Sequence, residues 1–528
     1  MTEVNVTAVN VTEVNKGQEF RASGYSWYVL GVLVLVYVLN FVDRQILSIL
    51  AEDIKRDLKL SDGDLGFLYG TAFGVFYALF GIPLGRLADN WNRVRLMTSG
   101  LTLWSAMTAL SGLATSGAML AGARVGVGVG EATAGPSAYS LISDWFPKAK
   151  RGTALAIYTT GLYLGGGLSL GIGGFVVQRW NATWPSGGPL GLTGWQAAFL
   201  VVGIPGLLLA LWVATLREPL RGQSEGIETP PHPAPFKAFG EDLLAIIPPF
   251  TLLGAWQRGN RVLAINLLVA AGIAGIVSLL VVLGEPVAQW TAVGLGSYAV
   301  FSWASTLKSR DAPAFALIVG NPAFIAIVLA YGLNSFVAYA VGFWAAPHAI
   351  RDLGVDPARA GFILGGIGAV AGFIGVTVGG VVSDWLRQSN PSGRIAVVLF
   401  GAVAPIAPVV FGFLSTTPST FYLLLFGAQL LAATALGAAG ASCQDLVLPR
   451  MRGTATGTFF IGTTLMGLAL GPYLAGRIST LTGSLPIGVI SLFAISPIAV
   501  AAGIYAYRTY PLAESSREAR ARAAGEAI

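Results

Sequence analysis

Apolar stretches of about 20 residues recur along most of this chain, and they restrict its fold more than any other feature. As a helix, a stretch of that length crosses roughly 30 Å of hydrocarbon. Inside a bilayer the backbone must satisfy its own polar groups, which favours helices over irregular structure. Only 11% of the 528 residues are charged and 54% are hydrophobic, whereas soluble domains carry about 25% charged residues. We therefore expect an all-α polytopic membrane protein.

Charged residues, prolines and glycines mark the boundaries of fourteen predicted spans, arranged six, two, six. The first six lie near 27–50, 66–88, 94–116, 118–145, 152–176 and 195–216; two more lie near 262–284 and 288–307; the last six lie near 321–348, 359–384, 394–414, 418–447, 453–476 and 485–507. The predicted domains are a tail (1–25), an N-terminal six-helix bundle (26–217), a linker with two inserted spans (218–310), a C-terminal six-helix bundle (311–508) and a second tail (509–528).

Basic residues predict the orientation. With a cytoplasmic N-terminus, only seven of the 32 lysines and arginines fall outside, namely Lys55, Arg56, Lys59, Arg179, Arg351, Arg359 and Arg477. The positive-inside rule therefore places both termini in the cytoplasm. The net charge of +6 is thereby explained without a nucleic-acid partner. One cysteine and many alanines and glycines point to a bacterial inner membrane.

The two sets of six spans contain similar sequences at corresponding places. "GFLYGTAFG" at Gly66 matches "GFILGGIGA" at Gly361, and "SDWFPKAKRGTALAIYTTG" from Ser143 matches "CQDLVLPRMRGTATGTFFIG" from Cys443. These offsets pair Gly85 with Gly380, Asp89 with Asp384, Asp144 with Asp445, and Arg151 with Arg452. Parallel repeats of this kind are common in membrane transport proteins. The two halves are thus predicted to be copies, with the middle pair of spans as an insertion.

Four charged residues lie within the predicted spans of the first half: Asp43 and Arg44 in the first, and Arg124 and Glu131 in the fourth. Arg124 and Glu131 are seven residues apart, about two helical turns, so both lie on one face. The four groups sum to zero charge and can form one network facing a cavity, as costly intramembrane charges usually do. The repeat offsets place Ala338, Tyr339, Leu425 and Ala432 at the corresponding positions of the second half. A cluster present once favours a coupling site; the alternative is a neutral clamp between two helices.

The inventory of reactive side chains excludes several classes of site. Cys443 is the only cysteine, so neither an intrachain disulfide nor a thiolate metal site can form. With only His232 and His348 in the chain, a histidine-rich metal site is excluded as well. No cofactor or metal is expected. No catalytic triad is visible, and we expect no enzymatic activity.

"GRLADNWNRVRLM", Gly85 to Met97, resembles the signature between the second and third helices of the major facilitator superfamily. Gly85, Asp89, Arg93 and Arg95 match it, whereas Asn90 and Asn92 replace a usual basic residue and a usual glycine, which puts the salt-bridge partner of Asp89 in doubt. The resemblance implies two six-helix bundles and a latch at the cytoplasmic face. Its predicted residues are Gly85, Asp89, Arg93, Arg95 and the repeat-related Asp384.

Within that superfamily the chain is similar to the spinster group. The similarity rests on "FVDRQ" in the first span, "LWSAMTAL" at Leu103 and "RVGVGVGEATAGPSAYSLISDWFP" from Arg124 to Pro147, and the inserted spans have no counterpart in it. Family members place a proton-titrating Asp followed by Arg in the first helix and Gly-Glu-Ala in the fourth. Asp43, Arg44 and Gly130-Glu131-Ala132 match these positions. The resemblance implies transport of lysophospholipids or sphingosine 1-phosphate.

Together these features predict a monomeric, proton-linked transporter that moves an amphipathic anion by alternating access through a lipid bilayer. Asp43, assisted by Glu131, is expected to gain and lose the proton, because cavity opening changes the environment of a carboxylate. Arg44 and Arg124 are expected to bind an anionic head group, with bidentate geometry available. A small organic acid or drug is the alternative substrate. A channel or a membrane sensor is the rival class; channel filters are commonly rings of repeated polar groups, and this cluster occurs once.

Overall fold

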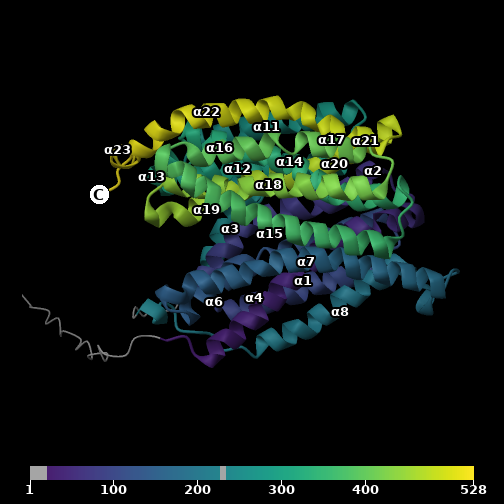
Figure 1. Cartoon of the computed structure of the whole chain (residues 1–528). Coiled ribbons are helices and arrows are strands. Elements are labelled where there is room, and N and C mark those ends of the chain that lie inside the picture. The colour runs from purple at the N-terminus through teal and green to yellow at the C-terminus, as the bar shows by residue number, and fades with distance from the viewer. Residues whose placement is uncertain (1–20, 226–232, 528) are drawn as a thin grey trace, which may run out of the picture.

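A computed structural model describes residues 21–225 and 233–527. These residues form helices joined by short connections, with no strand among them. Figure 1 shows two helical bundles lying side by side, with α7 (Lys148–Thr183) and α15 (Pro357–Ser389) running along their junction. The predicted all-α architecture of two bundles is thus confirmed. Most of the predicted N-terminal tail, and His232, lie outside the described residues.

The N-half, our name for Gly24–Ala214, supplies the first bundle. Its helices are α1 (Gly24–Leu58), α2 (Asp62–Gly66), the π-helical turn η1 (Phe67–Thr71), α3 (Ala72–Asn90), α4 (Arg93–Ser111), α5 (Gly117–Glu131), α6 (Ala134–Trp145), α7 and α8 (Gly194–Ala214). Side-chain oxygens of Ser23, Ser61 and Asn92 accept backbone N–H groups at the starts of α1, α2 and α4, as N-cap residues usually do. These caps explain why the helices begin there.

The C-half, Ala312–Ser515, supplies the second bundle. Its helices are α13 (Ala312–Leu317), α14 (Pro322–Arg351), α15, α16 (Gly393–Val403), α17 (Ile406–Phe413), α18 (Pro418–Asp445), α19 (Arg452–Thr463), the π-helical turn η5 (Thr464–Leu468), α20 (Gly471–Thr482), α21 (Leu485–Ser491) and α22 (Ser496–Ser515), followed by α23 (Arg517–Ala523). We call the face where α1 and α14 end the outer face, and the opposite one the inner face, following the predicted orientation.

The insert, residues 235–310, connects the halves. It consists of α9 (Pro235–Ile246), α10 (Phe250–Gln257), α11 (Asn260–Val282) and α12 (Val287–Arg310). The axes of α9 and α10 meet at 98°. Most side chains of α11 are exposed, as expected of a helix that faces lipid.

Each of the fourteen predicted spans coincides with a helical segment. Eleven segments are long and apolar enough to cross a membrane, or twelve if α9 and α10 count as one bent span. The predicted spans over α4, α5–α6 and α12 are not among the eleven. The reason is local: α5 and α6 are two short helices, while α4 and α12 carry many hydroxyl, amide and charged side chains. For these three, membrane crossing stays a prediction.

Glycines bring α7 and α15 into backbone contact along the outer part of their junction. A Cβ on Gly365 would lie 2.2 Å from the carbonyl oxygen of Gly167, and one on Gly174 would lie 2.3 Å from that of Pro357. Only glycine permits such an approach. The α7–α15 seam is therefore closed towards the outer face.

The second seam joins the α2–η1–α3 segment to the η5–α20 segment. A Cβ on Gly66 would lie 2.3 Å from the carbonyl oxygen of Pro472, and one on Gly70 would lie 2.3 Å from that of Leu468. The Thr71 hydroxyl at the end of η1 donates a hydrogen bond to the carbonyl oxygen of Ala469. The two π-helical turns thus face each other across the halves, and this seam too is closed towards the outer face.

Candidate functional site

The four charged residues predicted from the sequence come together between α1 and α5. The guanidinium of Arg44 donates two hydrogen bonds to one oxygen of Glu131, at 2.7 Å from Nη2 and 3.2 Å from Nε. Glu131 is 1% exposed and Arg44 is 7% exposed. A buried ion pair of this kind is costly to break because either partner alone would be an uncompensated charge.

Asp43 and Arg124 meet in a different way. Nη1 of Arg124 donates to the backbone carbonyl of Asp43 at 3.2 Å, and the two side chains form no ion pair in the described part of the chain. Both carboxylate oxygens of Asp43, and Nε and Nη2 of Arg124, are buried without a hydrogen bond to any described residue. Buried polar groups are rarely left in that state. These atoms therefore need a further partner, such as a proton, a water molecule or a ligand.

Aromatic rings enclose both arginines. The Cζ atom of Arg44 lies 4.8 Å from the ring centre of Phe41, 4.7 Å from that of Phe73 and 5.0 Å from that of Tyr77. Arg124 shares the Phe73 ring, at 5.4 Å. Cation–π contacts stabilise a guanidinium where water is excluded. The rings keep the two positive charges buried next to the two carboxylates.

A central cavity lies between the halves, beside this charge cluster. It has a volume of about 340 Å³ and is lined by residues of α1, η1, α7, α14, α15, α16, α17, α18 and α22. Phe41, which covers Arg44, lines it. None of the described residues that line it carries a charged side chain; its polar groups come from Gln45, Tyr69, Tyr163, Tyr331, Asn334, Ser335, Tyr339, Gln429 and Ser496. Arg44 and Arg124 thus lie behind the cavity wall in this conformation.

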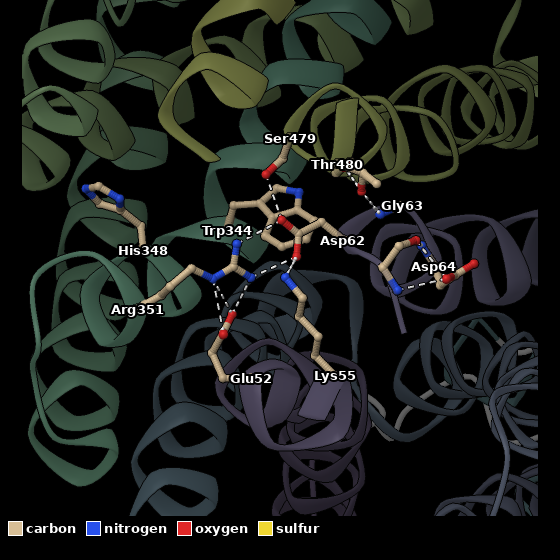
Figure 2. Close-up of polar contacts among 12 residues, drawn as sticks. Glu52, Lys55, Asp62, Gly63, Asp64, Trp344, His348, Arg351, Ser479 and Thr480 are labelled. Carbon is tan, nitrogen blue, oxygen red and sulfur yellow. Dashed lines mark hydrogen bonds and ion pairs between the residues drawn. The ribbon is translucent and has the colours of Figure 1, made fainter. Parts of the chain in front are cut away.

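A second charged cluster, the gate cluster, closes the outer face and was not predicted from the sequence (Figure 2). The Arg351 guanidinium at the end of α14 binds Glu52 of α1 at 2.6 Å and Asp62 of α2 at 2.8 Å. Asp62 also accepts from Lys55 at 2.6 Å and from the Ser479 hydroxyl of α20 at 2.6 Å. The gate cluster therefore ties two helices of the N-half to two of the C-half.

The residues of the predicted latch lie at the inner face but do not all meet. Arg93 is fully buried; it forms ion pairs with Asp144 and Glu218. Asp89 is exposed and forms no ion pair with any described residue. Arg95 is exposed as well, and Gly85 packs against Pro136, to which a Cβ would come within 3.7 Å.

The C-half has a similar cluster, with the difference that Asp384, the repeat partner of Asp89, takes part in it. Arg394, at the start of α16, pairs with Asp445, the repeat partner of Asp144, and its Nη2 lies 2.6 Å from Asp384. At the inner face, each cluster thus connects segments that belong to the same half or directly follow it. Arg93 pairs with Asp144 and Glu218 rather than with Asp89, its neighbour in the signature. Sequence reasoning missed Glu218 because it follows the last span of the N-half and reads as a loop residue.

Asp144→Asn is expected to lower the free energy of unfolding by about 2 kcal/mol, because it leaves the buried Arg93 with Glu218 as its only carboxylate partner. Asp89→Asn is the matched control and should change stability by less than about 0.5 kcal/mol, as exposed substitutions do. Thermal unfolding in detergent measures both. Equal effects of the two variants would contradict this reading of the inner face.

Two helical bundles that are closed at one face and meet around a central cavity are typical of membrane transporters. A family model described as Major Facilitator Superfamily matches residues 33–327. The chain belongs to the major facilitator superfamily.

Known relatives agree with this assignment. An "MFS-type efflux pump" of Mycolicibacterium smegmatis is 27% identical over 454 residues, 86% of this chain and 84% of the pump. "Protein spinster" of Drosophila melanogaster is 23% identical, with 86% of this chain and 62% of that protein covered. A probable galactarate/D-glucarate transporter of Escherichia coli K12 is 31% identical over 216 residues, only 40% of this chain and 44% of the transporter. These relatives are transporters, not enzymes.

A solved structure is similar along almost the whole chain. It is a crystal structure of a bacterial homologue of the human lysosomal transporter Spinster in an inward-facing and occupied conformation. It has a TM-score of 0.63 and 24% identity, and the match covers 95% of this chain and 97% of that chain. The matches to spinster proteins along most of the chain, together with this structure, confirm the predicted resemblance to the spinster group.

Proposed function

We propose that this protein is a secondary active transporter that moves an amphipathic anion by proton-linked alternating access. The observation that carries the proposal is the position of the single-copy charge cluster, buried directly behind Phe41 at the wall of the central cavity. A group that must couple a proton to a substrate needs contact with both. The closed outer seams and the gate cluster at the outer face support access from the inner face in this conformation.

The Arg44–Glu131 pair offers a direct means of coupling. While Glu131 is ionised, it occupies the Arg44 guanidinium at 2.7 Å. A proton on Glu131 removes that charge and leaves Arg44 without its partner, so that an anionic head group entering past Phe41 can replace the carboxylate. Proton and anion then bind together. The unpaired nitrogens of Arg124 and the unpaired carboxylate of Asp43 offer a second anion contact and a second proton site.

The cavity supports an amphipathic substrate. Its C-half wall is mainly aliphatic, including Leu333, Val337, Val341, Val376 and Val409. Such a wall suits an acyl chain, whereas the arginines lie on the N-half side and suit a phosphate or carboxylate. This division, with the spinster resemblance, favours a lysophospholipid or a sphingosine 1-phosphate-like lipid.

A sugar acid or another small organic acid is the second candidate substrate. It is favoured by the partial match to the probable galactarate/D-glucarate transporter and by the hydroxyl and amide groups at the cavity wall, among them Tyr331, Asn334 and Gln429. We further propose that both termini are cytoplasmic, that the membrane is a bacterial inner membrane, and that the monomer is the transporting unit.

Purified protein in liposomes tests the proposal. A labelled anionic lysophospholipid, lysophosphatidic acid, and labelled D-glucarate are supplied separately, with and without an imposed pH gradient, and liposomes without protein serve as the control. We expect saturable lysolipid accumulation, of up to ~10-fold per unit of pH gradient for one proton, that unlabelled lysolipid, but not glucarate, inhibits. If the gradient drove movement of glucarate but not of the lysolipid, the small organic acid would become the proposed substrate. A flux that is non-saturable and independent of the gradient would contradict a proton-linked transporter.

A further inference from the structure

The insert packs over the second seam, between the α2–η1–α3 segment and the η5–α20 segment, which we call the α3–α20 seam. A Cβ on Gly296 of α12 would lie 3.1 Å from Leu465 of η5 and 3.3 Å from Val75 of α3. Ala245 and Ile246 of α9 share a buried apolar cluster with side chains of α3, α12 and η5, and with Ala469 in the turn between η5 and α20. The insert therefore contacts both halves at once and covers the line along which they meet.

At the outer face the insert is anchored to the C-half. Glu285, in the connection between α11 and α12, accepts a hydrogen bond from Tyr473 at 2.7 Å and lies 3.2 Å from Nε of Arg477. Burial opposes ionisation, but hydrogen bonds from Tyr473, Trp290 and Arg477 outweigh it and lower the pKa of Glu285. Because a lowered pKa keeps the carboxylate ionised until the pH falls through it, this anchor persists at neutral pH.

At the inner face the insert is anchored to the N-half. Asp242 of α9 is 4% exposed and binds Arg86 of α3 at 2.6 Å, and Arg310 at the end of α12 lies 3.0 Å from the same oxygen. The Ser302 hydroxyl of α12 donates to the carbonyl oxygen of Ala245 at 2.8 Å, which fixes α9 to α12. The two anchors thus lie on opposite halves and at opposite faces of the membrane.

We propose that the insert is a brace that holds the outer face closed and keeps bilayer lipid out of the α3–α20 seam. Its two anchors are the contact of Glu285 with α20 and the contact of Asp242 with α3. Opening the outer face moves α2 and α3 away from α20. A rigid α9–α12 unit fixed to both resists that separation, so loosening either anchor favours the outer-open state. The brace rests on the alternating access of the proposed function, but not on its substrate or its proton.

A cysteine in the cavity reports whether the outer face is open. Ala345 of α14 lines the cavity and is 3% exposed, and it lies six residues, roughly 9 Å along the helix, below Arg351 of the gate cluster. Ala345→Cys is labelled with a membrane-impermeant maleimide applied from the outer face. Cys443 is fully buried, so the chain without Ala345→Cys measures the background.

In the Ala345→Cys background we expect Glu285→Gln and Asp242→Asn each to raise the labelling rate about fivefold. The double variant should raise it little further, because one rigid unit links the two anchors and loosening either one already releases the brace. The matched control is Glu518→Gln, whose exposed pair with Arg522 at 4.0 Å lies in α23.

Unchanged labelling in the two single variants and in the double variant would overturn the brace, and so would a fall in melting temperature without faster labelling. The readout needs no substrate and no pH gradient, so absence of transport in liposomes would contradict the proposed function and leave this result standing.

Discussion

Glu131→Gln is expected to abolish proton-driven accumulation while leaving exchange of substrate across the membrane intact. The amide has the shape of the carboxyl group but cannot release a proton, and it no longer holds Arg44 by charge at 2.7 Å. A transporter that moves one proton with its substrate accumulates it at most ~10-fold per unit of pH gradient. In the Glu131→Gln variant, the substrate concentration inside the liposomes should rise only until it equals the concentration outside. Uptake under an imposed gradient and counterflow without a gradient measure the two activities in the same liposomes.

Two companion variants distinguish the roles of the cluster. Asp43→Asn should behave like Glu131→Gln if its unpaired carboxylate takes a proton. Arg44→Ala should instead abolish both accumulation and counterflow, because it removes the anion contact rather than the proton site. Asp356→Asn, an exposed carboxylate at the start of α15, is the control. Normal accumulation by Glu131→Gln and Asp43→Asn together would reduce the cluster to a clamp between α1 and α5.

Arg351→Ala is expected to open the outer face. It removes the side chain that binds both Glu52 and Asp62 and leaves the nearly buried Asp62 with Lys55 and Ser479. Breaking a buried pair costs about 3–5 kcal/mol, and Arg351 is a quarter exposed, so we expect ~2 kcal/mol, or about a 30-fold shift towards the outer-open state. Labelling of Ala345→Cys from the outer face should accelerate by that factor.

Arg56→Ala is the matched control for the gate cluster. Arg56 lies at the same face and forms an ion pair with Asp53, but its side chain is 68% exposed and both partners belong to α1. It should leave the labelling rate unchanged, because exposed pairs within one helix contribute little. If Arg56→Ala and Arg351→Ala accelerated labelling equally, the effect would come from surface charge and not from a tie between the halves.

The sequence predicts the charge cluster well because charges inside an apolar span are rare and costly. The position of Asp43 and Arg44 in one span, and of Arg124 and Glu131 in another, is enough to bring them together. It does not decide which residue binds which, because that depends on the rotation and tilt of α1 against α5. The structure pairs Arg44 with Glu131 and turns Arg124 to a backbone carbonyl.

The gate cluster escapes sequence reasoning for the opposite reason. Glu52, Lys55, Asp62 and Arg351 all lie at the ends of spans, where charged residues ordinarily face water and carry no distinctive spacing. Their meeting depends on contacts between chain segments about 290 residues apart. The docking of the insert is equally unpredictable, because a helix such as α11 is apolar on every side and its pattern marks no contact face.

The facing π-helical turns η1 and η5 also bear on how the seam could move. A π-helical turn holds one residue more than an α-helical turn, and each residue turns an α-helix by about 100°. If η1 relaxed to an α-helix, the side chains before Phe67–Thr71 in the chain would rotate by that angle, about the helix axis, relative to the side chains after it. Tyr69 would then leave the cavity wall and Gly70 would leave the Leu468 carbonyl. A local change of helical register could thus alter both the cavity lining and the backbone contact of the seam in a single step.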